Sequence, residues 1–210
     1  MRINHEARAA AGARRRERTR AQLVDAAMRV IAEKGSEAAS IADFAAAADV
    51  SRGVFYNYFL TQDALVMAVW DKVWESVDQE IGEAADGIDD PAEQIARACV
   101  RLIDECLANP VRGWVWLRLD ATSALPTPRL SHHFLLFYGR GVEMGRFRPA
   151  PPAAATGLTS GGLRMAVRMA LTGAASREVA CQMVGMILAA LGLDHAEAER
   201  LARVPAARQG

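Results

Sequence analysis

The sequence predicts an all-α protein, and three features of composition and spacing support that fold class. Half of the residues (51%) are hydrophobic, which is enough to bury a sizeable core in a chain of 210 residues. Alanine, leucine, arginine and glutamate are abundant, whereas the β-branched and aromatic residues that favour strands are sparse. Apolar residues recur at i, i+3 and i+4 along most of the chain, which is the period of amphipathic helices.

Charge and composition divide the chain into three expected parts: a flexible basic arm at residues 1–14, a small helical domain at 15–60 and a larger helical domain at 61–210. Residues 1–60 hold ten Arg or Lys against seven Asp or Glu, a balance of +3 in a chain whose net charge is zero. A basic end on a neutral to acidic body fits an anionic partner for that end. A solvated tail is the simpler alternative, and the arm can be mobile until such a partner binds.

A first helix is expected at about residues 15–34. Gly35 follows it, in the position where a C-terminal cap is expected. The apolar stripe of this helix consists of Leu23, Ala27, Val30 and Ile31. Arginines precede and open the helix, and such basic segments reach phosphates or a narrow minor groove.

Residues 40–59 predict two short helices joined by a tight turn. Ser40 and Ser51 are cap-type residues at the two helix starts, and Asp49 tolerates a left-handed backbone in the turn between them. Phe55 and Phe59 lie one turn apart and point into a small core. The residues that point away from this core are Gly53, Val54, Tyr56 and Asn57. Such an outer face suits a helix placed in a DNA major groove, whereas the simpler alternative is a helical hairpin within a larger bundle.

The same residues carry a family resemblance. The pattern Ala45-x-x-x-Asp49-Val50-Ser51-x-Gly53-x-Phe55-Tyr56-x-Tyr58-Phe59, followed by Thr61-x-Asp63-x-Leu65, resembles the DNA-binding domain of TetR-type repressors over about residues 18–69. Two positions depart from the family pattern, because Asp49 replaces the usual turn glycine and Gln62 stands where a phosphate-contacting lysine is common. Beyond residue 69 the resemblance is in layout only, and it implies an all-helical ligand-binding and dimerisation domain.

The helix-turn-helix pattern and the resemblance together indicate a DNA-binding surface. The two tyrosines after the turn are expected to contact phosphates, with the two capping serines helping through their hydroxyls or the helix ends that they cap. Arg52, Val54 and Asn57 are expected to face bases, where Val54 suits a thymine methyl group and Asn57 an adenine. The expected DNA-binding residues are Arg16, Arg18, Arg20, Ser40, Ser51, Arg52, Gly53, Val54, Tyr56, Asn57 and Tyr58.

Residues 61–210 predict the larger helical domain. A long helix from Thr61 to about residue 81 has more apolar surface than the small domain needs, so we expect it to tie the two domains together. Further helices are expected at about 91–107, 111–123, 129–145, 153–171 and 176–191. The last two are the most apolar and are rich in small residues, which allow close helix packing. A membrane hairpin is the competing interpretation, but Arg164 and Arg168 interrupt the first of these helices and no apolar run is long enough to span a bilayer.

Two sites are expected in the larger domain. Its apolar and aromatic side chains predict a cavity for a small hydrophobic or aromatic effector, although each of them singly is more simply part of the core. The candidate walls are Trp70, Trp74, Cys99, Ile103, Trp114, Leu117, Phe134, Phe137, Tyr138, Met165 and Met169. The small residues of the last two long helices predict a homodimer interface, in keeping with the two-fold symmetry of a palindromic operator. The candidate contacts are Gly161, Ala166, Val184, Gly185 and Leu188.

No catalytic site, metal site or cofactor is predicted. The sequence shows no nucleophile–base pair, phosphate loop or metal cluster, and His132-His133 lacks helical ligand spacing. Cys99, Cys106 and Cys181 make no disulfide framework, so they are expected to be small buried hydrophobic residues, with redox sensing as the alternative. The arginine-rich N-terminus has no apolar signal core, which favours the cytoplasm.

The sequence therefore predicts a ligand-responsive, homodimeric DNA-binding regulator, most simply a repressor of a double-stranded, roughly palindromic operator. By resemblance, an effector that enters the larger domain tilts the long helix and changes the spacing of the two recognition helices. The alternative is a helical small-molecule sensor module with weak or lost DNA binding. Gln62 favours that alternative slightly, and the arginine arm argues against it.

Overall fold

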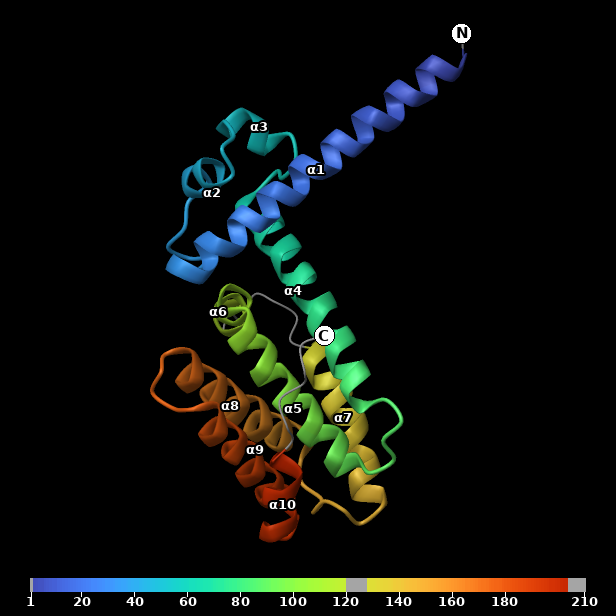
Figure 1. Cartoon of the computed structure of the whole chain (residues 1–210), viewed down its shortest axis with the longest axis vertical. Helices are drawn as coiled ribbons and strands as arrows, with labels where there is room; N and C mark the ends of the chain where they lie inside the picture. The colour runs from blue at the N-terminus through green and yellow to red at the C-terminus, as the bar shows by residue number, and fades with distance from the viewer. Residues whose placement is uncertain (1, 120–127, 204–210) are drawn as a thin grey trace. The chain divides into compact units, whose positions relative to one another are not determined.

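The computed structural model describes residues 2–119 and 128–203, and over these residues it is all-helical, which confirms the predicted fold class (Figure 1). The chain divides into two compact units, Met1–Lys72 and Val73–Gly210. Their boundary lies inside α4 (Gln62–Ala85), whereas the sequence places its domain boundary just before that helix. The difference arises because the first turns of α4 belong to the first unit, where Leu65 and Val69 are fully buried.

The first unit consists of α1 (Arg2–Lys34), α2 (Ile41–Ala47), α3 (Arg52–Tyr56) and the start of α4. The fully buried side chains of its core include Leu23, Ile31, Phe44, Phe55 and Leu65. After α1, Gly35 takes a left-handed φ of 85° and donates its N–H to the Ile31 carbonyl at 2.9 Å, as expected of a C-terminal cap.

The start of α1 differs from the prediction. The helix begins at Arg2, whereas the sequence analysis expected an arm over residues 1–14 and a helix start near residue 15. Residues 2–14 contain several alanines and arginines, which are strong helix formers, and no proline. Since Gly12 is the one glycine of this segment, the strong helix formers allow the backbone of α1 to continue through it.

The second unit holds the rest of α4 and six further helices of the described residues. They are α5 (Pro91–Ala108), α6 (Pro110–Leu119), α7 (Pro128–Glu143), α8 (Pro152–Leu171), α9 (Arg177–Leu191) and α10 (His195–Ala202). α5 is central, because it packs against α6, α7, α8, α9 and α10 (Figure 1). The helix expected at 111–123 is described as far as Leu119, and its remainder lies outside the described residues.

Arginine–carboxylate pairs join different helices of the second unit. The pairs are Arg146 with Asp90 and Glu197, Arg112 with Glu80 and Glu105, and Arg177 with Asp104, at 2.5–2.8 Å. The planar guanidinium donates several hydrogen bonds in fixed directions, so one arginine can hold two helices in a defined orientation. These pairs fix the ends of the helices that surround the interior of the unit.

The small residues of α8 and α9 serve close packing within the chain. The two helices pack against each other and against α5. A Cβ atom at Gly162 of α8 would lie only 2.8 Å from Cδ1 of Ile187 on α9, so a larger residue there would require the Ile187 side chain to shift. Over the residues that the structure describes, no helix is both long enough and apolar enough to cross a bilayer.

Candidate functional site

Capping side chains fix the turn between α2 and α3. The hydroxyl of Ser40 accepts the Asp43 N–H at 3.2 Å, and the Asp43 carboxylate accepts the Ser40 N–H at 2.9 Å, which is a capping box. Hydrogen bonds from Ser40 and then from Lys34 hold the pKa of Asp43 well below its ordinary value. The hydroxyl of Ser51 accepts a backbone N–H of α3 at 3.2 Å. Asp49 adopts the left-handed conformation, with φ of 54°, as expected for the turn.

α3 buries one face and exposes the other. The rings of Phe55 and Phe59 are buried, with their centroids 6.1 Å apart, as the sequence predicts. Arg52, Gly53, Tyr56 and Asn57 are exposed, while Val54 and Tyr58 are half-buried. The helix contains no acidic residue, so its exposed face can approach a polyanion without charge repulsion.

Two arginines of α1 lie against the chain that follows α3. The guanidinium carbon of Arg16 lies 5.9 Å from the ring centroid of Tyr58, and its Nη2 donates to the Asn57 carbonyl at 3.4 Å. The guanidinium carbon of Arg20 lies 5.3 Å from the ring centroid of Phe59. The structure therefore places Arg16 against Tyr58 and Arg20 against the neighbouring Phe59, so three of the predicted DNA-binding residues lie close together. Arg18 is exposed.

Gln62 has a structural role that the sequence analysis missed. Its Nε2 donates to the carbonyls of Ser36 and Ala39, at 2.9 and 3.1 Å, in the segment between α1 and α2. Both carbonyls lie outside the helices and need a donor. The Gln62 amide thus links the start of α4 to the segment between α1 and α2. Gln62 therefore has a structural role, in addition to replacing the lysine that is common at this position.

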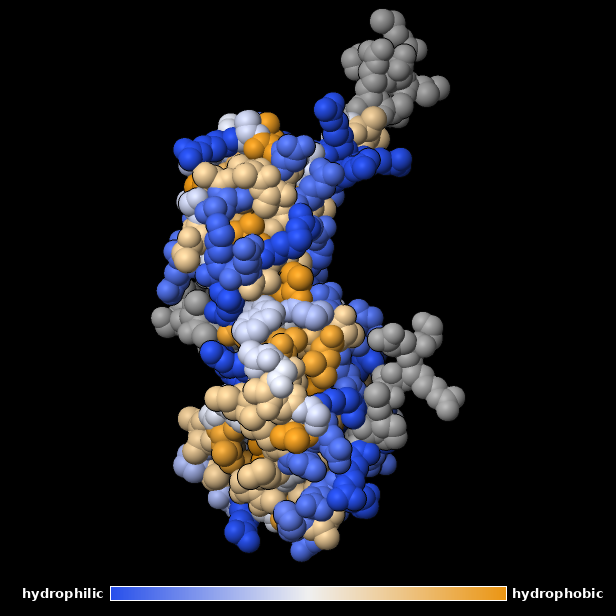
Figure 2. Space-filling view, turned by 60° about the vertical axis from the view of Figure 1, so that its left-hand side comes forward, coloured by the Kyte–Doolittle hydropathy of each residue, from blue (hydrophilic) through white to orange (hydrophobic). Residues whose placement is uncertain are grey.

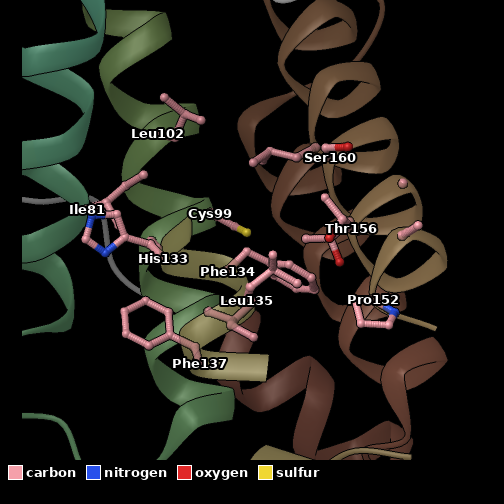
Figure 3. Close-up of a pocket in the computed structure, with 16 residues that line it drawn as sticks. Ile81, Cys99, Leu102, His133, Phe134, Leu135, Phe137, Pro152, Thr156 and Ser160 are labelled. Carbon is pink, nitrogen blue, oxygen red and sulfur yellow. The ribbon is translucent and has the colours of Figure 1, made fainter. Parts of the chain in front are cut away.

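The second unit contains a cavity of about 490 Å³ between α4, α5, α7 and α8 (Figure 3). Its lining residues are Ile81 of α4; Ile95, Ala98, Cys99 and Leu102 of α5; His133, Phe134, Leu135 and Phe137 of α7; and Pro152, Ala153, Thr156, Gly157, Thr159, Ser160 and Leu163 of α8. Most of these side chains are apolar, and the few polar ones are the hydroxyls of α8 and one imidazole. Such a volume and lining are typical of small-molecule sites.

Three of the predicted ligand-binding residues, Cys99, Phe134 and Phe137, line this cavity. Tyr138 is engaged elsewhere: its hydroxyl bonds two backbone groups between α7 and α8 at 2.8 and 2.9 Å, and its ring stacks on Phe134 with 5.6 Å between centroids. The other predicted residues do not line the cavity; they are Trp70, Trp74, Ile103, Trp114, Leu117, Met165 and Met169. Trp70 belongs to the first unit. That the three lining residues bind an effector stays a prediction.

The α8 wall of the cavity was missed by the sequence analysis. Thr156, Thr159, Ser160 and Leu163 recur at i, i+3, i+4 and i+7, which places them on one face of the helix. That period is the signal that could have found them. Two features of the sequence obscure this period. The small residues of the helix also fit a dimer interface, and hydroxyl side chains are more often exposed than buried.

The cysteine beside the cavity is an uncharged thiol. Burial raises the pKa of Cys99 to about 12, so its sulfur stays protonated near neutral pH. Burial raises the pKa of Cys106 to about 12 as well, and it also raises the pKa of Cys181. Redox sensors need an accessible thiolate, so these environments do not favour that alternative. Among the described residues, no group of three His, Cys, Asp or Glu side chains could hold a metal ion.

The predicted dimer contacts divide into two sets. Gly161 is exposed on α8, and a Cβ atom there would meet nothing within 4 Å. Ala166, Val184, Gly185 and Leu188 are buried inside the chain. Gly185 packs on α10, where a Cβ atom would lie 3.4 Å from the Ala198 carbonyl oxygen. The four buried residues therefore pack helices within the chain and do not lie on its surface.

The fold and these two sites define a helix-turn-helix regulatory protein with a separate helical unit. A family model described as bacterial regulatory proteins of the tetR family matches residues 23–69. A second model, described as the tetracyclin repressor-like C-terminal domain, matches residues 90–204, which is more than half of the chain. The chain belongs to the TetR family of transcriptional regulators.

Two curated relatives match parts of this chain. The HTH-type transcriptional regulator HbdR of Aromatoleum sp. (strain CIB) is 30% identical over 82 residues, which are 39% of this chain and 36% of that protein. The HTH-type transcriptional regulator BetI of Brucella anthropi is 32% identical over 113 residues, 53% of this chain and 58% of that protein. The chain thus spans about a third of the length of HbdR and somewhat over half of the length of BetI.

Solved structures match more of the chain. RolR without ligand has a TM-score of 0.68 and 29% identity, covering 88% of this chain and 97% of that chain. RolR in complex with resorcinol has a TM-score of 0.64 and 29% identity, covering 93% and 98%. FadR from Bacillus subtilis, in complex with stearoyl-CoA, has a TM-score of 0.67 at 16% identity over 81% of this chain and 96% of that one, a likeness of fold alone.

Proposed function

We propose that this chain is a homodimeric, ligand-responsive regulator, most simply a repressor that leaves a palindromic DNA operator when a small hydrophobic or aromatic effector binds. The observation that carries this proposal is the largely apolar cavity of about 490 Å³ in the second unit, a feature that DNA binding alone does not need. The RolR complex supports it, because a 29% identical protein of similar fold is described with the small aromatic ligand resorcinol.

The proposed DNA interface is the exposed face of α3 with the basic side chains of α1. Arg52, Val54 and Asn57 read bases, and the hydroxyls of Tyr56 and Tyr58 contact phosphates. Ser40 and Ser51 cap the two short helices and so orient this face. Arg16, Arg18 and Arg20 add phosphate contacts. The arrangement supports this assignment because Arg16 already lies over the ring of Tyr58.

The proposed dimer interface is the exposed apolar stripe of α8 and α9. The stripe consists of Leu158, Met165, Val179 and Met186, whose exposed fractions are 40–68%. Gly161 lies three residues after Leu158 and four before Met165, so it belongs to the same face of α8. Figure 2 shows apolar side chains exposed on the second unit. An exposed apolar face fits a second copy of the chain, and a palindromic operator requires two-fold symmetry.

Coupling between the sites requires that the effector bind one conformation of the dimer more tightly than the other. Only such a difference in affinity can shift the balance between DNA-competent and DNA-incompetent forms. α4 carries residues of both units, and it contributes Ile81 to the cavity wall. We therefore assign the transmission of the signal to this helix.

The test combines operator binding with ligand binding. A DNA site is first selected from random duplexes with the purified full chain, and its affinity is measured by fluorescence anisotropy. Aromatic compounds of resorcinol size are then screened by thermal shift, and each compound that raises the melting temperature is added to the protein–DNA complex. We expect at least one to lower operator affinity by 5-fold or more, about 1 kcal/mol of coupling. Selection of no DNA sequence, or compounds that stabilise the protein without affecting DNA, would contradict the proposal.

A second candidate function is a sensor module with weak DNA binding. The observation that favours it is Gln62, whose amide is already bonded to two backbone carbonyls and carries no charge for a phosphate. The same experiment separates the two candidates, because the sensor alone predicts ligand binding with no selected operator.

A further inference from the structure

We propose that the hydroxyl of Thr159 is the polar recognition group of the cavity, and that it selects an uncharged aromatic molecule that carries a hydroxyl group. This inference rests on the proposed function, since it assigns the chemistry of the effector to the cavity in the second unit. It also names a specificity-determining residue that the family match does not indicate.

Thr159 has a hydrogen-bonding group that lacks a partner. The residue lines the cavity and is 5% exposed, and its Oγ1 is buried without a hydrogen-bond partner. Threonine in a helix can bond the carbonyl three or four residues earlier. Thr172, which ends α8, does so with the carbonyls of Arg168 and Met169 at 2.9 and 3.2 Å. Native proteins rarely leave a buried hydroxyl unpaired, so a ligand is the natural partner for Thr159.

A bound molecule can reach this hydroxyl without a movement of α8. Threonine in a helix populates two side-chain rotamers, and rotation about the Cα–Cβ bond moves the hydroxyl relative to the methyl group. Because Thr159 forms part of the cavity wall, such a rotation can present Oγ1 to the cavity. The hydrogen bond gained from a ligand would compensate for the rotation.

The hydroxyls of the cavity wall carry no charge. Thr156 and Ser160 flank Thr159 on the same face of α8, and the lining includes no Lys, Arg, Asp or Glu. His133 is the other polar lining residue, and its Nε2 is already 2.8 Å from Oδ1 of Asp78. A carboxylate or ammonium group in this cavity would lose hydration without a Lys, Arg, Asp or Glu side chain of the wall to replace it. A neutral hydroxyl can donate to Oγ1 or accept from it.

The opposite walls suit a flat apolar body. Figure 3 shows Cys99 of α5 and Phe134 of α7 across the cavity from Thr156 and Ser160 of α8. Phe134 and Phe137 present aromatic rings, which favour stacked or edge-on contacts with a second ring. The cavity therefore combines a hydrocarbon side with a hydroxyl side, and a phenol matches both.

The test compares three probes that share one ethylbenzene body: 4-ethylphenol, ethylbenzene and 4-ethylbenzoate. Their affinities for the full-length protein are measured by titration calorimetry for the wild type, Thr159→Val and the control Thr172→Val. We expect the wild type to bind 4-ethylphenol about tenfold more tightly than ethylbenzene, the effect of one net hydrogen bond. Thr159→Val keeps the side-chain shape and should reduce that ratio to about one. Thr172→Val should leave the ratio unchanged.

The variant also has a ligand-free readout. If Oγ1 is unpaired in the free protein, Thr159→Val should raise the melting temperature, because it removes a buried hydroxyl without leaving a cavity. A lower melting temperature would show that the hydroxyl is bonded already and would overturn the inference. A phenol-to-hydrocarbon ratio that survives Thr159→Val, tighter binding of 4-ethylbenzoate than of 4-ethylphenol, or no binding of any probe would overturn it too.

Operator release separates this inference from the proposed function. If 4-ethylphenol binds through Thr159 and leaves operator affinity unchanged, the ligand assignment stands and the regulatory proposal fails. If another compound releases the operator equally from the wild type and from Thr159→Val, the regulatory proposal stands and the assignment of Thr159 fails.

Discussion

The polar side chains that fix the turn of the first unit and those that join the helices of the second unit bond partners at different distances along the chain. In the first unit, Ser40, Asp43 and Ser51 bond backbone groups only three residues away. In the second unit, Arg146 bonds residues 51 and 56 positions away in the sequence, and the Arg177–Asp104 pair spans 73 positions. Local bonds orient a surface without depending on the rest of the fold, whereas long-range bonds hold helices around an interior. Substitutions should therefore affect binding in the first unit and folding in the second.

The largest effect should come from Gly185→Glu. Gly185 packs on α10, with the Ala198 carbonyl oxygen 3.4 Å and Cβ of Ala202 3.5 Å from the position of an added Cβ atom. A glutamate would force a long charged side chain into this buried contact between α9 and α10, so we expect a loss of about 4 kcal/mol or more in the free energy of unfolding. Circular dichroism during urea titration measures it, and native-like unfolding of the variant would contradict the packing.

Gly161→Glu is the matched control on α8. The site is open, so the protomer should keep its fold, and replacing glycine inside a helix is favourable in itself. The added charge should instead weaken the proposed dimer, since Gly161 shares a face with Leu158 and Met165. Sedimentation velocity should show more monomer than in the wild type. An unchanged dimer would remove this face of α8 from the interface, and a well-folded wild-type monomer at micromolar concentration would overturn the dimer itself.

A smaller loss is expected from Arg146→Met, which removes the link between the start of α5 and α10. Arg146 bonds Asp90 and Glu197, each at 2.8 Å and about 30% exposed, so the loss should be about 2–3 kcal/mol. Arg97→Met is the control, because Arg97 pairs with Glu93 only one helical turn away at the surface. That variant should lose less than about 0.5 kcal/mol. Equal losses would contradict the contrast between local and long-range bonds.

The Arg146 effect should depend on pH. Hydrogen bonds from Arg146 lower the pKa of Asp90 below its ordinary value. The folded state therefore binds this proton less readily than the unfolded state, so the stabilisation is present above about pH 4 and is lost as the pH falls through the lower folded pKa. The stability difference between the wild type and Arg146→Met should narrow as the pH is lowered from about 4 to 2. If the stability difference between the two proteins does not change with pH, the ionised carboxylate of Asp90 does not contribute to the effect of Arg146.

Arg52→Ala probes the first unit, where we expect a change in binding with little change in stability. Arg52 is exposed at the start of α3, so the free energy of unfolding should change by less than about 0.5 kcal/mol. Discrimination at one base pair of the operator should fall by about 1–3 kcal/mol. Tyr56→Phe is the control, since loss of a phosphate contact should weaken all DNA sequences alike. Equal losses on operator and random DNA for Arg52→Ala would exclude base reading by this side chain.

The first unit could be predicted closely because its features are local. A cap-type residue, a left-handed turn and a helical period each involve neighbours within four positions, and the structure shows all three at Ser40, Asp49 and Phe55. The start of α1 could not be placed, because alanine and arginine favour helix whether or not the segment is bound to anything. Gln62 was misjudged since its partners, 23 and 26 residues away, are invisible to a local pattern.

The sequence predicts that an apolar cavity exists but not most of its lining residues. Helical periodicity distinguishes buried from exposed residues, but it does not distinguish a buried residue that lines a cavity from one that packs in the core. Phe134 and Tyr138 lie one turn apart on α7 and look equivalent in sequence. Only Phe134 lines the cavity, because the hydroxyl of Tyr138 finds two backbone partners beyond the end of the helix. Gly161 and Gly185 present the same problem, since a small residue permits close packing without showing what packs there.

A small effect is expected at Gln62, which makes long-range bonds within the first unit. Gln62→Leu removes both donors to the carbonyls of Ser36 and Ala39, and it should cost about 1 kcal/mol because the site is only half-buried. Gln62→Lys keeps a donor within reach of these carbonyls, so its loss of stability should be smaller. If the ammonium group also meets a phosphate, the log–log salt dependence of operator binding should steepen by about 0.9, a change that Gln62→Leu cannot produce. If the log–log salt slope of operator binding is the same in all three proteins, residue 62 does not contact a phosphate. If Gln62→Leu is as stable as the wild type, the two hydrogen bonds of Gln62 do not stabilise the fold.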